Sequence, residues 1–125
     1  MTMIEDLREA LLSFKEEESF DAVISIYVGG AIGNLTQVGV GLENFEFTST
    51  STWQEFLGPE AMKSPIYPAA KNYITLYVRT LFDPPAPSTI ATIEKVLEES
   101  IWRIKVYADS LLEQEGVING LPDKS

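Results

Sequence analysis

Apolar residues recur at helical spacing along most of the chain, beginning near its N-terminus. Residues 3–18 carry apolar side chains every three or four positions, with acidic residues between them, a pattern typical of an amphipathic helix. Thr2 and Glu5 have the spacing of a capping box at its start. Three glutamates at 16–18 disfavour a helix C-terminus, where the helix dipole prefers cations, so a break is expected near Ser19.

The segment 20–33 fits both a strand and a helix. Its β-branched residues favour a strand, and its apolar residues also form a helical stripe. The segment is long for a strand, and Ser19 or Asp21 can cap a helix that ends at Gly33-Asn34. A buried helix is therefore predicted over these residues.

Residues 35–52 have a different pattern, in which apolar residues alternate with glycine or polar residues and a Ser/Thr run closes the segment. This period of two, with Asn44 available for a turn, predicts an extended loop or an irregular β-hairpin. A connection of this length is often functional. Residues 52–57 then predict a short capped helical turn, which Gly58-Pro59 ends.

The second half of the chain predicts two longer helices joined by a proline corner. The first covers residues 65–82 and begins after Ser64, a suitable N-cap, or as late as Pro68. Its apolar stripe is wide, so most of its sides should be buried. Prolines in the segment 83–87 end it, because proline lacks an N–H donor and pushes the preceding residue out of the helical region.

The last helix is predicted over residues 89–115, with Ser88 as its N-cap and Gly116 directly after its last turn. Its ~27 residues span about 40 Å, more than the roughly 36 Å diameter expected for a compact domain of this size. The short connection makes this helix antiparallel to the preceding one. Such a hairpin has an apolar face that must be covered, either by sister copies or by the two N-terminal helices.

The predicted fold class is therefore mainly α, a small helical bundle with a long C-terminal helical hairpin and an extended loop at about 35–52. A chain of 125 residues is expected to form one domain, here residues 1–116, followed by a flexible tail, 117–125, that orders only on a partner. No apolar run is long enough for a transmembrane helix, and the acidic N-terminus lacks the basic start of a signal peptide.

The net charge of the chain makes nucleic acid an unfavourable binding partner. The chain has 19 acidic and 9 basic residues, a formal charge of −10, and the acidic excess is spread along its whole length. Binding to nucleic acid by phosphate neutralisation needs clustered lysine and arginine, so sequence-independent affinity for DNA should be poor. The same charge also favours solubility.

The sequence contains no pattern typical of catalysis or metal binding. It has no cysteine and no histidine, which removes disulfides, the usual zinc sites and nucleophiles paired with histidine. The carboxylates are scattered, the glycine-rich segment 29–33 lacks a P-loop lysine, and the Ser/Thr run 48–52 has no neighbouring base. We therefore expect no enzyme activity, no metal and no cofactor, and interpret the glycines as close-packing or chain-turning positions.

Aromatic residues concentrate in the two long helices. A stacking platform for single-stranded nucleic acid would need cations between the rings, and the few lysines and arginines there do not offset the acids. Core packing is therefore predicted for these rings, together with a surface ion pair between Glu99 and Arg103. The rings are those of Tyr67, Tyr73, Tyr77, Phe82, Trp102 and Tyr107.

Three short elements share the pattern of one known family. The segment 71–85 contains Lys-x-Tyr-Ile and ends in Phe-Asp-Pro-Pro, a Trp-Arg-Ile triplet follows at 102–104, and a Thr-Trp-x-x-Phe element precedes them at 52–56. In these elements the chain resembles the small head–tail connector (adaptor) proteins of long-tailed bacteriophages.

The resemblance implies a non-enzymatic virion protein of the neck, between capsid and tail, that is present in the host cytoplasm during assembly. It implies a homo-oligomeric ring, usually of twelve copies, whose partners are the portal protein and a tail-side neck or tail-terminator protein. Double-stranded DNA would pass through this ring without tight binding, because twelve copies would carry a charge of about −120 that repels phosphate. No contact with a membrane is implied.

Candidate interaction residues lie on the extended loop, the hairpin and the tail, and the tail itself is the candidate for docking on the portal. The candidates for contact with a sister copy or partner are Phe45, Phe47, Trp53, Tyr67, Tyr77, Trp102 and Leu121, and the candidates to face the channel are Glu43 and Glu46.

Two other classes of function remain open at this point. An acidic inhibitor that mimics DNA would place its acids along one face at phosphate-like spacing, whereas the acids here are dispersed. A small enzyme that uses carboxylates or the Gly29–Gly33 turn would have a concave pocket with convergent polar groups.

Overall fold

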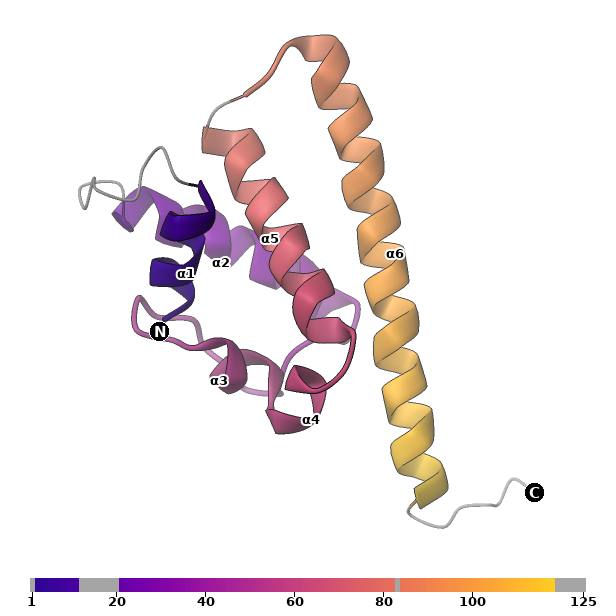
Figure 1. The fold of residues 1–125 in the computed structure, drawn as a ribbon. Helices are drawn as coiled ribbons and strands as arrows, with labels where there is room; N and C mark the ends of the chain where they lie inside the picture. Colours follow the sequence, from indigo (N-terminus) through magenta and orange to yellow (C-terminus); the bar gives the residue numbers. More distant parts are fainter. Residues whose placement is uncertain (1, 12–20, 83, 119–125) are drawn as a thin grey trace.

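The computed structural model describes residues 2–11, 21–82 and 84–118 (Figure 1). Within these ranges the chain forms six α-helices and no strand. The predicted fold class, mainly α with a long C-terminal helical hairpin, is confirmed. The helices are α1 (Met3–Leu11), α2 (Asp21–Gln37), α3 (Trp53–Leu57), α4 (Pro59–Met62), α5 (Ile66–Phe82) and α6 (Pro87–Ile118).

The start of α1 is the predicted capping box. The Glu5 N–H donates to Thr2 Oγ1 at 3.1 Å, and the Thr2 N–H donates to Glu5 Oε1 at 2.9 Å, which satisfies two donors that the helix cannot pair internally. Met3 and Leu7 are fully buried. The rest of the predicted helix 3–18, with its expected break near Ser19, lies outside the described residues.

The prediction of a helix rather than a strand is confirmed for α2, but its predicted end at Gly33-Asn34 is wrong. The helix continues to Gln37, because Leu35 lies on the same face as the buried Val28 and Ala31 and is itself fully buried. Burying a leucine side chain is worth about 1.5–3 kcal/mol, more than the roughly 1 kcal/mol that a glycine costs within a helix.

The loop between α2 and α3 contains no strand in the described structure, so the β-hairpin alternative is not found. The predicted loop also began too early, because residues 35–37 belong to α2. A backbone hydrogen bond from the Leu42 N–H to the Phe56 carbonyl, 2.7 Å, holds the loop against α3. Asn44 adopts a positive φ of 70°, as expected for a turn residue.

The short helix α3 begins and ends as predicted. Thr52 and Glu55 form a complete capping box, and Gly58 ends the helix with a φ of 89°, a conformation that glycine adopts without steric cost. Pro59 then occupies the first position of α4, where its missing N–H is no loss.

The boundaries of the hairpin helices differ in detail from the prediction. Helix α5 begins at Ile66, whose N–H donates to Ser64 Oγ at 3.1 Å. Helix α6 begins at Pro87, two residues early, because the Ala86 carbonyl accepts the first helical hydrogen bonds. Ser88 therefore lies inside the first turn and is not the N-cap.

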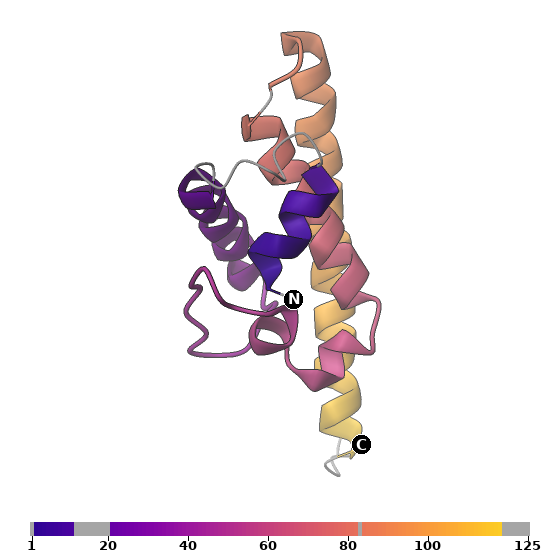
Figure 2. The same cartoon turned by 60° about the vertical axis from the view of Figure 1, so that its left-hand side comes forward.

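The predicted stop of the last helix at Gly116 is also wrong. Helix α6 runs through Gly116 to Ile118, a total of 32 residues, which corresponds to about 48 Å. It is antiparallel to α5, as predicted, and its C-terminal end projects beyond the other helices (Figures 1 and 2).

Helix α5 is the centre of the fold, since α1, α2, α4 and α6 all pack against it. On α5 the side chains of Ala70, Ile74 and Val78 are fully buried. Helix α6 contributes little to this core, because among its side chains described up to residue 110 only Ile104 and Ala108 are buried. Most of the α6 surface is therefore open.

Candidate functional site

The most distinctive surface of the molecule is the side of α6 that faces away from α5. Ile104 and Ala108 point inward and are buried, whereas Trp102 has 63% of its surface exposed. Large apolar side chains do not gain from exposure to water, so a group of them on one helix indicates a contact surface. We call this group the outward face of α6, and it consists of Val96, Trp102, Val106 and Tyr107.

The charged groups around Trp102 differ from the prediction. Lys105 Nζ pairs with Asp109 Oδ2 at 2.9 Å and lies 6.0 Å from the centre of the Trp102 ring. The ion pair on the described part of α6 is this one, not the predicted pair of Glu99 and Arg103. Because both side chains are about half exposed, such a pair contributes only about 0.3–0.5 kcal/mol.

Core packing is confirmed for only some of the aromatic side chains. Tyr73 is buried and its hydroxyl accepts a hydrogen bond from Asn34 Nδ2 at 3.0 Å. Burial raises the pKa of the Tyr73 hydroxyl above its ordinary value of 10.0. Trp102 and Tyr107 are exposed, so core packing was the wrong prediction for these two rings. The side chain of Phe82 lies outside the described residues.

The other tryptophan, Trp53, lies inside the subunit. Its indole N–H donates to Asp6 Oδ2 at 2.9 Å, and its ring meets that of Tyr67 edge-on at 5.9 Å. Lys71 Nζ contacts the same carboxylate oxygen at 2.8 Å. This hydrogen bond raises the pKa of the Lys71 amine above its ordinary value of 10.5. Asp6 could not be identified from the sequence, because no local pattern links it to Trp53.

The remaining contact candidates lie on two elements. Phe45 and Phe47, on the loop, and Tyr67 and Tyr77, on α5, are half-buried against the core. Leu121 lies outside the described residues. Their assignment to an interface stays a prediction, as does that of Trp53.

The channel candidates Glu43 and Glu46 are both exposed on the loop between α2 and α3. The loop to which both residues belong projects from the helical body beside α3 (Figures 1 and 2). Exposure leaves both free to face solvent or a partner, and their position on the channel stays a prediction.

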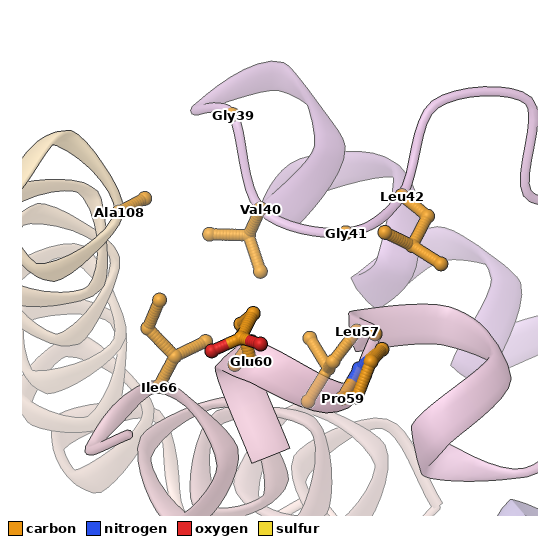
Figure 3. Close-up of a pocket in the computed structure, with 11 residues that line it drawn as sticks. Gly39, Val40, Gly41, Leu42, Leu57, Pro59, Glu60, Ile66 and Ala108 are labelled. Atoms are coloured by element: carbon orange, nitrogen blue, oxygen red, sulfur yellow. The ribbon is translucent and has the colours of Figure 1, made fainter. Parts of the chain in front are cut away.

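A cavity of about 230 Å³ lies between this loop, α4 and Ala108 in the C-terminal half of α6 (Figure 3). Val40, Leu57 and Ile66 line it, and Glu60 is the charged side chain in its wall. Apolar walls with a single carboxylate do not provide the acid–base pair that a carboxylate-based enzyme needs. The cavity is suited to holding an apolar side chain.

The face of α2 that points away from α5 is a feature that the sequence analysis missed. The prediction of a buried helix is wrong on this side, because Ile26 is 71% exposed. A Cβ atom added at Gly29 or Gly33 would meet nothing within 4 Å, so these glycines are not close-packing positions. The helical period contains the signal, since Ile26 lies about 200° around the helix from the buried Ile24.

The described residues contain neither a candidate metal site nor a candidate membrane span. No group of three or more acidic side chains in this part of the chain could hold a metal ion. None of its helices combines the length and apolar character needed to cross a bilayer.

Comparison with known families identifies the chain. The model of the phage connector protein family matches residues 3–110. Comparison with curated proteins and with solved structures found no match. The match extends from α1 through most of α6, and so includes the hairpin and its outward face. The resemblance seen in the sequence is therefore confirmed, and the chain belongs to the phage connector protein family.

Proposed function

We propose that this connector is one subunit of a ring that joins the portal protein to the tail-side neck or tail-terminator protein around the DNA channel. The observation that carries the proposal is the outward face of α6, where Trp102 is 63% exposed. A monomer gains nothing from this exposure, whereas a second protein surface would bury the indole. Copies that contact one another through two different surfaces form a ring when the rotation between neighbours closes.

Among the contact candidates, Trp102 supports the ring most directly. The half-buried rings of Phe45, Phe47, Tyr67 and Tyr77 have surface left to contribute at the edge of an interface. Trp53 is already engaged by Asp6 inside the subunit, so its role is to hold the surface that a partner contacts.

The acidic loop suits the channel. Glu43 and Glu46 are exposed, and a subunit with a net charge of −10 repels the phosphate backbone. A ring lined by these carboxylates lets double-stranded DNA pass without retaining it. The ring would carry twelve copies, and its place would be the neck of the virion after assembly in the host cytoplasm.

The tail 117–125 is the proposed contact with the portal. Helix α6 projects beyond the other helices (Figure 1), so its last turn lies away from the helical body. Docking of a short terminal segment adds an attachment that does not disturb the hairpin. Deletion of residues 117–125 should abolish attachment to the portal and leave the hairpin folded, and unchanged attachment would reject this contact.

The experiment that tests the ring is a mass measurement of the purified full chain, with electron imaging of the same sample and of virions. We expect closed rings of about twelve copies, and the same subunit in the virion neck. A particle of 13.9 kDa at every concentration, together with no subunit in the virion, would reject the proposal.

A further inference from the structure

The outward face of α2, which consists of Ala22, Ile26, Gly29 and Gly33, is an uncharged surface on an acidic protein. From residue 22 to residue 37 there is no charged side chain, although the whole chain is 22% charged. Ile26, at 71% exposed, stands in the middle of this face. Neither a nucleic acid nor a charged peptide gains from such a surface, so its partner must be apolar.

The shape of this face is a shallow shelf beside one apolar side chain. Gly29 and Gly33 are four residues apart, on the same side of α2, and both have open space where a Cβ atom would stand. An opposing side chain can therefore rest directly on the helix backbone next to Ile26. A flat aromatic ring gains the most contact area from such a shelf.

The outward face of α6 supplies the complementary shape. Trp102 and Val106 are also four residues apart, on one side of α6. Trp102 has 63% of its surface exposed, and Val106 has 48%. The two faces do not meet within one subunit, because Ile26 and Trp102 both remain exposed there, at 71% and 63%. One copy must therefore meet another.

We propose that Trp102 and Val106 of one copy pack on the outward face of α2 of the next copy. This inference rests on the proposed ring and names its two contacting surfaces. Because the surfaces are different and point in different directions, the contact repeats head to tail and can close into a ring. It is apolar at its centre, with the indole covering the glycine shelf and Ile26 packing beside it.

Cross-linking in this cysteine-free chain tests the pairing without background. The full chain carrying both Gly33→Cys and Val106→Cys is treated with a short bismaleimide and analysed by denaturing electrophoresis. Head-to-tail packing predicts a ladder that rises to the ring size. A mixture of the two single variants should stop at dimers that contain one copy of each.

The matched control replaces Val106→Cys by Gln54→Cys, an exposed position on α3, and should give no ladder. Dimers from Gly33→Cys alone would show that α2 meets α2 and would overturn the pairing. Wild-type rings without any Gly33–Val106 cross-link would also overturn it, while leaving the proposed ring intact. Absence of both rings and cross-links would reject the ring and the pairing together.

A substitution gives a second, independent readout. Ile26→Asp places a charge on the α2 face and should raise the concentration for half-assembly at least tenfold, with an unchanged circular dichroism spectrum. Leu81→Asp, at an apolar position on α5 that is 44% exposed, is the control and should assemble as the wild type does. Equal assembly of the Ile26→Asp variant and the wild type would overturn the proposal.

Discussion

The Trp53 indole N–H donates to Asp6 Oδ2 at 2.9 Å, across 47 positions of sequence. The same oxygen accepts from Lys71 Nζ at 2.8 Å, so a single carboxylate joins α1 to both α3 and α5. Trp53 is only 5% exposed, so most of its ring is removed from water, where a lost hydrogen-bond partner is costly. The attachment of α1 therefore depends on Asp6 as well as on its apolar side chains.

The variant Asp6→Ala should lower the free energy of unfolding by about 1–3 kcal/mol, because it leaves the buried Trp53 N–H without an acceptor. Urea denaturation followed by tryptophan fluorescence measures this change. Glu9→Ala, at an exposed position of the same helix, is the matched control and should change the value by less than about 0.5 kcal/mol. Equal effects of the two substitutions would show that the hydrogen bond does not stabilise the fold.

The capping box of α1 gives the protein a specific pH dependence. The hydrogen bond from the Thr2 N–H holds the pKa of the Glu5 carboxyl below its ordinary value of 4.5. A pKa that is lower in the folded state means that the carboxylate stabilises the fold above the unfolded-state pKa, and that this contribution is lost as the pH falls through the folded-state pKa.

Glu5→Gln should therefore flatten the decrease of the urea midpoint below pH 4.5, because the amide oxygen still accepts the hydrogen bond and does not titrate. Thr2→Pro removes the N–H that lowers the pKa and should flatten the decrease too. Midpoints measured at half-unit steps from pH 3 to pH 6 test both variants. Profiles parallel to that of the wild type in both cases would contradict this assignment.

The two tryptophans should respond to substitution in different ways. Trp53→Ala removes a buried ring and should lower the free energy of unfolding by about 3–5 kcal/mol. Trp102→Ala removes an exposed ring, so the unfolding of the monomer should change by less than about 0.5 kcal/mol. In the proposed ring, loss of such an aromatic contact should weaken assembly by about 2 kcal/mol, roughly 30-fold.

Urea denaturation and sedimentation of the same samples separate the two effects of these variants. The expected pattern is loss of stability for Trp53→Ala and loss of assembly for Trp102→Ala. A Trp102→Ala variant that assembles as the wild type does would remove the main support for the outward face of α6 as an interface.

Local patterns explain which parts of the fold could be predicted. The capping boxes of α1 and α3 are three-residue spacings, and the proline corner after α5 acts on its immediate neighbours, so these features depend only on nearby sequence. The end of α2 does not. It depends on the burial of Leu35, a tertiary contact that outweighs the local preference of Gly33-Asn34 to end a helix.

The candidate surfaces were harder to predict. Helical spacing shows which apolar residues share one side of a helix, but it does not show how many of them the rest of the fold covers. Trp102 follows the half-buried Ile101 by one residue, which rotates it by about 100° and out of the core. The sequence predicted core packing for the Trp102 ring, which the structure does not show. Asp6 and Trp53 show the other limit, since only the packing of α1 beside α3 brings their side chains together.

The glycines provide the last prediction, since two of them should respond to alanine with opposite signs. Gly41 has a φ of 102°, and a Cβ atom there would clash with the buried Phe56 ring. Gly41→Ala should therefore cost about 1–3 kcal/mol in backbone strain, with a further cost from overpacking. Gly29 lies within α2 and has open space at its Cβ position, so Gly29→Ala should stabilise the monomer by about 0.5–1 kcal/mol.

Urea denaturation of the two alanine variants at a concentration where the chain is monomeric measures both changes on one scale. Destabilisation by Gly29→Ala would mean that the outward face of α2 is covered within the subunit, because only a close neighbour could reject one methyl group there. Such a result would remove the open shelf on which Trp102 of a second copy is proposed to rest. Stabilisation would leave that shelf free for a neighbouring copy.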